Sequence, residues 1–543
     1  MQPEVVLIGM PASGKSKVAT AYGEKYGVPV ADSDVVISTS LSSTIEQIFK
    51  EKGEASFREA EVRAVEDLLH NFDGIVSLGG GSVEQKESRQ LLREYRMNGG
   101  VVVYLDVDKQ IAIERINRKN YTRPLFGDQN RTVDDISKHW DKLKAVRTAN
   151  LENACTFRIQ VDSENSINIA RKQIRNFVKK TSVITINADD DLYDVIISKS
   201  KSVYYNAVSL LGSDVSKVAV IHTASVKRHL IGLLDALKLL NYNAYTIEVE
   251  DAERGKTTTS YTTTLRKLAE LGFVRSDAII GFGGGAVTDL SGFVASTYMR
   301  GIKNLNIPTS LLAMVDASVG GKTGINLEQG KNLCGTFYSP IGVVAAMNTL
   351  YTLPAREFTQ AMGEVLKMGL IQDAKILDLI NDDVDKNLKK IIYRTVKAKK
   401  HFVCEDFKES GNRIFLNYGH SFAHAIEKLD DYNLRHGEAV SLGMLIAAEF
   451  AHANGILSKE LLQTHYNYAK LLNLPTSLEL NASFEDMTKC MKLDKKVSKN
   501  KLQLIVLEKL QQPIIYNDPD EMQMKTAVEK VIHFQQRSRS VIF

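Results

Sequence analysis

A glycine-rich loop lies close to the amino terminus. Residues 9–16 read Gly-Met-Pro-Ala-Ser-Gly-Lys-Ser, a complete G-x-x-x-x-G-K-S sequence between an apolar run at 5–8 and a helical pattern. In such a loop the backbone N–H groups around Gly9 and Gly14 face a phosphate, Lys15 adds a positive charge, and the Ser16 hydroxyl can ligate Mg²⁺. The loop predicts a site for a nucleoside triphosphate with Mg²⁺; a flexible glycine turn is the alternative.

Three further segments suggest what receives the phosphoryl group. Asp32-Ser33-Asp34 follows the first helical pattern, Arg58 opens a later one, and Gly79-Gly80-Gly81 follows a second apolar run. A guanidinium fork and glycines that allow close backbone approach suit a small carboxylate or polyol. The two aspartates could serve Mg²⁺ and a hydroxyl nucleophile, or they could form only a turn or a helix cap.

A second glycine cluster suggests another nucleotide site. Gly283-Gly284-Gly285 follows an apolar run at 278–280 and precedes a helical pattern that contains Asp289. A dinucleotide pyrophosphate approaches the backbone in this arrangement. The cluster lacks G-x-G-x-x-G spacing, so a tight turn between a strand and a helix is the alternative.

One glutamate and three of the histidines in the second half of the chain could form a metal site. Glu364 and Lys367 share one face of a helical pattern, His420 and His424 share another, and His436 follows. One carboxylate and two imidazoles form a three-ligand site that suits Zn²⁺ acting as a Lewis acid. The histidine pair alone is weak evidence, because a histidine at helical spacing is usually a core or capping residue.

Basic residues accompany this predicted metal site. They are Lys322, Lys331, Lys367, Lys399 and Arg413. Cations brought together without an anionic ligand would repel one another, so phosphate and carboxylate groups are the predicted partners. A solvated basic face is the alternative, and it fits Lys399 and Lys400 better than Lys322, which lies among glycines.

Apolar runs predict the elements that position these groups. Strands are predicted at 5–8, 74–78, 100–106, 155–161, 183–186, 193–197, 218–221, 244–249 and 278–280, and long helical periodicity follows residue 350. The predicted fold class is α/β. We expect a P-loop kinase domain with a parallel sheet and helices at 1–172 and a basic linker at 173–182. We expect a two-lobed unit after it, with an α/β nucleotide-binding lobe at 183–350 and a helical metal-binding lobe at 351–543.

Length and composition exclude several classes of protein. The 543 residues are 44% hydrophobic, which is enough for two or three packed cores, and the net charge of +4 does not indicate a nucleic-acid partner. No stretch reaches the ~18 apolar residues of a membrane span. Four widely spaced cysteines indicate a reducing compartment, and there is no room for a signal peptide before the first loop. We expect a cytoplasmic protein that binds neither membrane nor nucleic acid.

The first unit resembles the shikimate kinase family over about residues 1–172. Thr122-Arg123-Pro124-Leu125 is similar to the family's lid motif, and Arg147 falls where a second carboxylate-binding arginine is expected. After Arg147 the chain lacks the proline and tyrosine of the usual R-x-P-x-Y segment. The resemblance implies that ATP and Mg²⁺ bind at Gly9, Gly14, Lys15, Ser16 and Asp32. It implies that shikimate binds at Asp34, Arg58, Gly80, Gly81 and Arg147, with Lys15, Asp34 and Arg123 acting in catalysis.

The second unit closely resembles the 3-dehydroquinate synthase family over about residues 183–510. The matching segments include Glu253-x-x-Lys256, the triple glycine, Tyr298-Met299-Arg300-Gly301, 308–312, 316–323 and the three metal segments. The resemblance implies Zn²⁺, or Co²⁺ in its place, at Glu364, His420 and His436. The implied NAD-binding residues are Glu253, Lys256, Gly284, Gly285, Asp289, Thr309, Ser310, Lys322 and Lys331. The implied substrate-binding residues are Arg300, Asp316, Lys322, Asn332, Lys367, Lys399, Arg413, Asn417, His424 and Lys496.

Together the resemblances imply a bifunctional enzyme of the shikimate pathway. The kinase would use ATP to convert shikimate into shikimate 3-phosphate. The synthase, as a homodimer, would use NAD to oxidise C5 of 3-deoxy-D-arabino-heptulosonate 7-phosphate, eliminate phosphate, return the hydride and close the ring to 3-dehydroquinate. Lys322 and His424 would act in this catalysis, and Arg300 would reach the phosphate across the dimer interface.

Three alternatives stay open. A metal-dependent polyol dehydrogenase could share the lobes, although an uncharged polyol gives Lys322, Lys331, Lys367 and Arg413 no partner. A related cyclase could act on sedoheptulose 7-phosphate, although Lys399, Asn417 and His424 favour the carboxylated substrate. The first domain could be a degenerate binding or scaffold module, a hypothesis that rests on the altered segment after Arg147.

Overall fold

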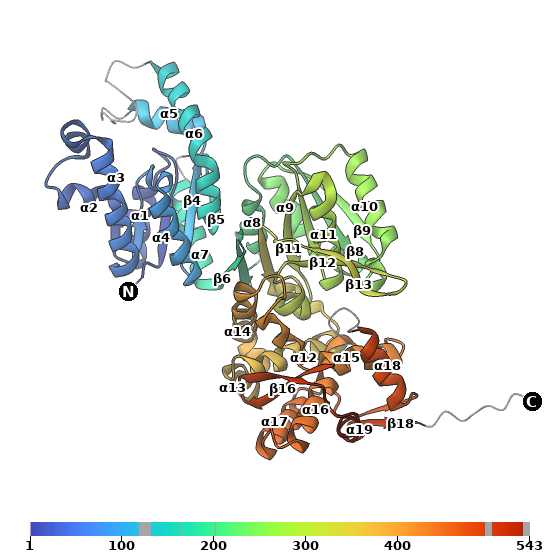
Figure 1. Cartoon of the computed structure of the whole chain (residues 1–543). Coiled ribbons are helices and arrows are strands. Elements are labelled where there is room, and N and C mark those ends of the chain that lie inside the picture. The colour runs from blue at the N-terminus through green and yellow to red at the C-terminus, as the bar shows by residue number, and fades with distance from the viewer. Residues whose placement is uncertain are drawn as a thin grey trace, which may run out of the picture.

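A computed structural model describes residues 2–118, 132–163, 166–189, 191–200, 202–494 and 502–535. Figure 1 shows three parts: an amino-terminal unit in blue and cyan, a second sheet with its helices in green and yellow, and a mostly helical part in orange and red. Within the described ranges, no helix has both the length and the apolar character needed to cross a membrane.

The amino-terminal unit is built on a parallel sheet of order β2-β3-β1-β4-β5. Its strands are β1 (Val5–Ile8), β2 (Val30–Asp32), β3 (Ile75–Ser77), β4 (Val102–Val107) and β5 (Phe157–Val161). Its helices are α1 (Lys15–Tyr26), α2 (Ser33–Ser40), α3 (Ile45–Asn71), α4 (Lys86–Met97), α5 (Lys109–Arg118), α6 (Val133–Ala154) and α7 (Ser166–Lys180). The predicted strands match β1, β3, β4 and β5 to within two residues at each end. Strand β2 was not predicted, because its residues Val30, Ala31 and Asp32 are not fully buried and do not form an apolar run.

The segment predicted as a basic linker, 173–182, is regular structure instead. It forms the end of α7 and the first two residues of β6 (Thr181–Ala188). Ile174 and Phe177 are buried in the core of the first unit, and the Phe177 ring stacks on Phe157 with centroids 4.1 Å apart. The basic residues that suggested a linker occupy the outer face of an amphipathic helix.

The second part contains a sheet of order β6-β7-β14-β11-β10-β8-β9, parallel except for the antiparallel β6-β7 pair. Its other strands are β7 (Asp191–Ser198), β8 (Lys217–Thr223), β9 (Asn243–Val249), β10 (Ala278–Gly283), β11 (Lys303–Pro308) and β14 (Gly342–Ala346), and β12 (Lys322–Leu327) with β13 (Gly330–Phe337) forms a separate hairpin. Its helices are α8 (Val203–Val208), α9 (Lys227–Leu239), α10 (Thr258–Glu270) and α11 (Gly285–Thr297). Each strand predicted between 183 and 280 lies within one of these strands.

The third part is mainly helical, as predicted. Its helices are α12 (Ala355–Ile371), α13 (Lys375–Asp382), α14 (Val384–Glu405), α15 (His420–Leu429), α16 (His436–Ala453), α17 (Lys459–Leu471), α18 (Phe484–Asp494) and α19 (Glu521–Glu529). The short strand pairs β15 (Leu478–Leu480) with β18 (Ile532–Phe534), and β16 (Gln503–Lys509) with β17 (Gln512–Asn517), lie at its edge. One apolar cluster joins these helices to a face of the seven-stranded sheet.

Strand β7 contacts both neighbouring parts through the alternation of its side chains. Val195 and Ile197 pack in the cluster of the helical part, whereas Ile196 packs in the cluster that contains the amino-terminal core. On the amino-terminal side, Asp194 Oδ2 lies 2.8 Å from Arg96 Nη2 of α4, and both side chains are at most 4% exposed. The two units are therefore joined by a shared apolar core and a buried ion pair.

We predict that Asp194→Asn destabilises the joined units. The variant keeps the side-chain volume but leaves the buried Arg96 guanidinium without its counter-charge, which typically costs about 3–5 kcal/mol. Chemical unfolding followed by circular dichroism measures the change. The control is Asp141→Asn, which breaks the exposed pair with Lys109 and should cost at most about 1 kcal/mol. Equal effects of the two substitutions would contradict the buried pair's role.

Candidate active sites

The phosphate-binding loop has the backbone geometry that its sequence predicts. Gly9 and Gly14 have φ values of +155° and +92°, and a Cβ on Gly9 would lie 2.6 Å from the carbonyl oxygen of Leu105. Helix α1 begins at Lys15, whose Nζ donates to the carbonyl oxygens of Gly9 at 3.0 Å and Met10 at 3.2 Å. The loop therefore curves around the lysine ammonium at a helix amino terminus, which is where a phosphate binds.

The predicted magnesium residues lie in contact with each other. Ser16 Oγ donates to Asp32 Oδ2 at 2.6 Å, and Asp32 lies at the end of β2. The other oxygen of Asp32 accepts from the backbone N–H of Asp34 and caps α2. Capping and metal binding were alternative interpretations of Asp32, and the structure places its carboxylate where it can do both.

The predicted acceptor residues converge beside this loop. A Cβ on Gly81 would lie 2.4 Å from Arg58 Nη1, and a Cβ on Gly80 would lie 3.2 Å from Pro11 of the loop. Arg147 of α6 is fully buried. It lies near Arg58, because the carboxylate of Glu84 contacts both arginines. Glu84 was not predicted from the sequence, and neither was Glu61, whose buried carboxylate lies 2.8 Å from Arg58 Nη1. Neither belongs to a motif.

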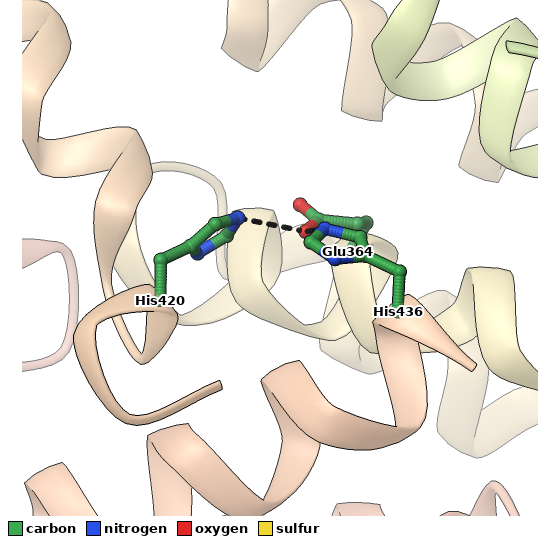
Figure 2. Close-up of side chains that lie close together, drawn as sticks. All are labelled: Glu364, His420 and His436. Carbon is green, nitrogen blue, oxygen red and sulfur yellow. Dashed lines mark ion pairs between the residues drawn. The ribbon is translucent and has the colours of Figure 1, made fainter. Parts of the chain in front are cut away.

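The predicted metal ligands come from three helices and face one centre. Glu364 is on α12, His420 begins α15 and His436 begins α16 (Figure 2). Their ligand atoms all lie within 4.8 Å of one another, and Nε2 of each histidine is 3.3 Å from Glu364 Oε1. These are the three residues that the family resemblance implied as ligands, and the i,i+4 pair of histidines contributes only His420 to the group. The ring of His424 lies beside the set, with its centroid 5.6 Å from that of His420.

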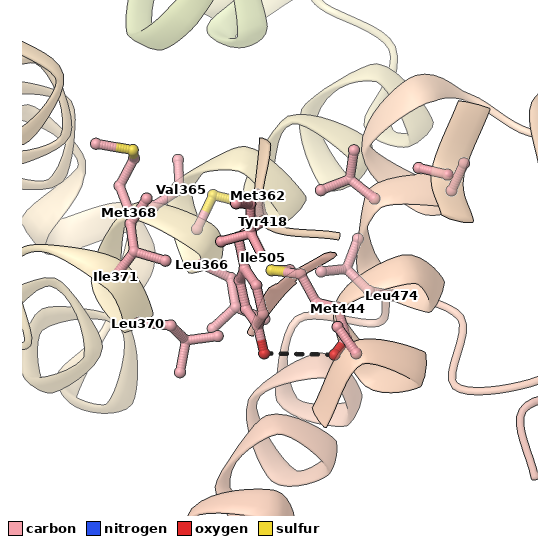
Figure 3. Packing of buried hydrophobic residues seen from close by; sticks show 14 of the residues in the cluster. Met362, Val365, Leu366, Met368, Leu370, Ile371, Tyr418, Met444, Leu474 and Ile505 are labelled. Carbon is pink, nitrogen blue, oxygen red and sulfur yellow. Dashed lines mark hydrogen bonds between the residues drawn. The ribbon is translucent and has the colours of Figure 1, made fainter. Parts of the chain in front are cut away.

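Glycines beside the ligands allow the helices to approach. A Cβ on Gly437 would lie 1.8 Å from the carbonyl oxygen of Gln360, and one on Gly363 would lie 2.3 Å from that of Gly437. Gly419 has a φ of +81° and precedes His420, and a Cβ there would meet the backbone nitrogen of Met444 at 2.8 Å. No other residue fits these positions without moving a helix. The same helices share a packed apolar core that includes Tyr418 and Met444 (Figure 3).

The electrostatics of the set suit a divalent cation. Burial acts to raise the pKa of Glu364, but Lys367 and His420 outweigh it and hold that pKa well below its usual value. Burial lowers the pKa of His420 to about 4. Burial also opposes the charged form of His436, but the carboxylates of Glu364 and Glu427 raise its pKa to about 10. Glu364 faces the Lys367 ammonium through Oε2, and its Oε1 lies 3.3 Å from Nε2 of each histidine. A buried, ionised carboxylate that faces two imidazoles fits a Zn²⁺ ion.

Each of the four predicted lysines around the metal set that lie in the described ranges faces a carboxylate of the chain. Lys399 Nζ lies 2.6 Å from Asp316 Oδ1, and Lys331 Nζ lies 3.2 Å from Glu427 Oε1. Lys367 pairs with Glu364 and Lys322 pairs with Glu409. The repulsion between these cations is thus relieved in part by carboxylates of the chain itself. Glu364 lies on the same helical face as Lys367, as their spacing predicted, whereas the other three acids come from other segments and sequence spacing did not reveal them.

Two of the other residues predicted to bind the synthase substrate, Asn417 and Arg413, are hydrogen-bonded within the chain. Asn417 Nδ2 donates to Glu409 at 3.2 Å, and the buried Arg413 donates to the carbonyl oxygens of Phe407 at 2.5 Å and Gly320 at 3.0 Å. Arg300 is exposed, and no ion pair joins it to another described residue. Arg123 and Lys496 lie outside the described residues, so their predicted roles stay predictions.

The predicted dinucleotide residues gather at the carboxyl ends of β10 and β11. Gly284 caps α11, and the N–H of Thr309 donates to the carbonyl oxygen of Gly283 at 2.8 Å. Ser310 Oγ would lie 3.5 Å from a Cβ on Gly284. Adjacent strand ends above a helix amino terminus form the usual crevice for a pyrophosphate.

A polar network borders the dinucleotide crevice. Lys256 Nζ lies 2.5 Å from Asp289 Oδ2 and also contacts Asn332, while Glu253 accepts from Asn326 at 2.5 Å. Burial raises the pKa of Asp289, and Lys256 acts in the opposite direction. The predicted residues Glu253, Lys256, Asp289 and Asn332 thus lie together around the hairpin β12-β13.

We predict that Gly437→Ala removes the metal site. The new methyl group meets backbone of α12, so α12 and α16 must separate and Glu364 must move away from His436. Overpacking of this kind costs about 1–3 kcal/mol. We expect Zn²⁺ content, measured by elemental analysis, to fall well below one ion per chain. MgATP binding by the amino-terminal unit is the internal control, and a full zinc content in the variant would contradict the packing argument.

We also predict that Glu427 orients His436. Its Oε2 lies 3.5 Å from His436 Nδ1, and the side chain is 7% exposed. Loss of such an orienting carboxylate typically weakens metal binding by about 10–100-fold. Competition titration of Zn²⁺ with a chelator should show this loss for Glu427→Gln. Glu405→Gln, which removes the exposed partner of His401, should leave the affinity unchanged; a similar loss in both variants would refute the orienting role.

Comparisons with known proteins agree with the order of these sites. Residues 11–178 match the family model for shikimate kinase, 246–360 match that for the 3-dehydroquinate synthase N-terminal region and 361–497 match that for its C-terminal region. A 3-dehydroquinate synthase from Arthrobacter sp. (strain FB24) is 40% identical over 355 residues, which cover 64% of this chain and 97% of that protein.

Solved structures share the fold of the second unit. A 2-deoxy-scyllo-inosose synthase, complexed with carbaglucose-6-phosphate, NAD⁺ and Co²⁺, matches with a TM-score of 0.58 at 23% identity, covering 64% of this chain and all of that one. A 2-epi-5-epi-valiolone synthase from Streptomyces hygroscopicus subsp. jinggangensis 5008, with NAD⁺ and Zn²⁺ bound, matches with a TM-score of 0.58 at 24% identity, covering 63% and 98% of the chains. The chain belongs to the 3-dehydroquinate synthase family, carries a shikimate kinase domain before the synthase unit, and combines the two enzyme activities.

Proposed function

We propose that the synthase unit converts 3-deoxy-D-arabino-heptulosonate 7-phosphate into 3-dehydroquinate and phosphate, and that the kinase unit converts shikimate and ATP into shikimate 3-phosphate and ADP. One observation carries the synthase assignment: Glu364, His420 and His436 converge within 4.8 Å beside lysines that can bind a phosphorylated sugar acid. A cytoplasmic location, a homodimer and Mg²⁺ as the kinase ion are part of the proposal.

In the kinase unit, Lys15 and the loop amides bind the transferring phosphates of ATP. Ser16 and Asp32 hold the accompanying Mg²⁺. Arg58 and Arg147 bind the shikimate carboxylate, and the glycines at 80 and 81 let the ring approach the backbone. Asp34 lies beside Gly79, where its carboxylate can accept the proton of the attacking hydroxyl. Arg123 would close over the phosphates.

In the synthase unit, Glu364, His420 and His436 would hold Zn²⁺ and the β10-β11 crevice would hold NAD. When bound, Zn²⁺ supplies a Lewis acid for a substrate oxygen, and NAD supplies a hydride acceptor. The structural neighbours that contain NAD⁺ with Co²⁺ or Zn²⁺ support this choice of cofactors.

The basic residues around the metal site would bind the substrate's anionic groups. Lys399, Arg413 and Lys322 lie in the part of the site formed by Asp316, Glu409 and Gly320, and they can neutralise a carboxylate and a phosphate. His424 lies beside the metal set and can move a proton. Arg300 would complete the site from a partner subunit.

The two alternative substrates differ in charge. A polyol carries no anionic group for Lys322, Lys399 and Arg413. This class of substrate would therefore leave the basic residues of the site without a substrate group to bind. The neighbouring sugar-phosphate cyclases share the fold at under 25% identity, whereas the 40% identical relative is a 3-dehydroquinate synthase. This difference favours the carboxylated substrate over sedoheptulose 7-phosphate.

We predict that single substitutions separate the two activities. Lys15→Ala should lower shikimate-dependent ADP formation by about 10²–10³-fold, because a charge-stabilising donor is lost, and should leave phosphate release from the heptulosonate unchanged. Glu364→Gln should reduce that phosphate release by at least about 100-fold and spare the kinase.

Coupled assays on each purified full-length variant measure both products. NADH that accumulates with an alcohol would instead indicate a polyol dehydrogenase. Undiminished ADP formation in Lys15→Ala, or its absence in the unmodified protein, would refute the kinase assignment.

A further inference from the structure

Glu84 lies between the two arginines of the kinase acceptor site. It ends a short helical turn (Ser82–Glu84) directly after the triple glycine. Its carboxylate contacts Nε of Arg147, and its Oε2 lies 3.5 Å from Nη2 of Arg58. Glu84 is thus the carboxylate that joins Arg58 of α3 to Arg147 of α6.

Arg58 has two carboxylate partners besides Glu84, whereas Glu84 is the one carboxylate that pairs with Arg147 among the described residues. Arg58 also contacts Glu61 at 2.8 Å and Glu54 at 3.0 Å. Arg147 is fully buried, and its Nη1 has no hydrogen-bond partner among the described residues. An unpartnered buried guanidinium nitrogen is costly, so Arg147 is a strong site for a second carboxylate oxygen.

We propose that Glu84 competes with the shikimate carboxylate for Arg147 and Arg58, and so sets the enzyme's affinity for shikimate. The proposal rests on the proposed kinase function. Arg58 already faces Glu54 and Glu61, so a substrate carboxylate that binds beside Glu84 adds a further negative charge and is repelled by it. Departure of Glu84 relieves this repulsion and frees Nε of Arg147 for the substrate. Its side chain is 24% exposed, so it has a route to solvent, whereas Glu61 is 1% exposed and stays in place.

The competition lowers apparent affinity without changing the chemical step. If Glu84 occupies the arginines for about nine-tenths of the time, the apparent dissociation constant for shikimate is raised about tenfold. Asp34 and Lys15 lie outside this contact, so phosphoryl transfer from the bound complex is unaffected. The signature is a change in KM with an unchanged kcat.

The test compares Glu84→Gln with Glu84→Asp and Glu87→Gln in the full-length protein. Glu84→Gln removes the competing charge, and we expect KM for shikimate to fall about tenfold with kcat within about twofold of the unmodified enzyme. Glu84→Asp keeps a carboxylate on a shorter side chain and should give an intermediate KM. Glu87 is exposed on α4 and its substitution removes the same charge nearby, so Glu87→Gln should change nothing.

Direct binding gives a second readout. Trp140 is the only tryptophan of the chain and lies buried on α6, two helical turns before Arg147. Fluorescence titration with shikimate, without ATP, should show tighter binding by Glu84→Gln. An unchanged or raised KM in this variant, or a loss of kcat, would mean that Glu84 does not compete but positions Arg147. No shikimate-dependent ADP formation by the unmodified enzyme would instead refute the proposed function and this inference with it.

Discussion

The synthase site depends on three helices whose backbones lie so close together that only glycine, which has no side chain, fits at their contacts. Gly363 and Gly437 let α12 and α16 touch through backbone atoms, and Gly419 lets the start of α15 contact α16 near Met444. Each metal ligand is the neighbour in sequence of one of these glycines. Because the helices cannot shift without opening this contact, the positions of Glu364, His420 and His436 are determined by backbone packing rather than by the ligands' own side chains.

Both active sites hold their basic groups with carboxylates of the chain. Asp316 and Glu409 face lysines of the synthase site, and Glu84 faces the arginines of the kinase site. Such pairs limit the repulsion between neighbouring cations and the cost of burying them. In the competition that we propose for the kinase site, the shikimate carboxylate replaces Glu84, so its affinity reflects the difference between two similar interactions.

The two enzymes form one packed body. Helix α7 continues directly into β6, and the alternation of β7 divides its side chains between the core of the kinase unit and the core of the helical lobe. The buried Arg96–Asp194 pair lies at this boundary. The basic residues near 173–182 looked like a linker because charge was visible in the sequence, while burial of Ile174 and Phe177 depended on a neighbouring strand.

The amino-acid sequence by itself determined the order of the units, most strands of both sheets, and the residue types of both sites. Local motifs carry that information, because a phosphate-binding loop and apolar alternation act over a few residues. Only the tertiary structure decided which charges meet. Glu84, Glu409 and Glu427 belong to no motif, and their basic partners lie on other elements. Glu61 belongs to no motif either, although its partner Arg58 lies three residues earlier on α3. The resemblance implied Glu364, His420 and His436 as one set, but helical spacing alone pointed to His420 and His424. The packing of α12, α15 and α16 brings the three distant residues together.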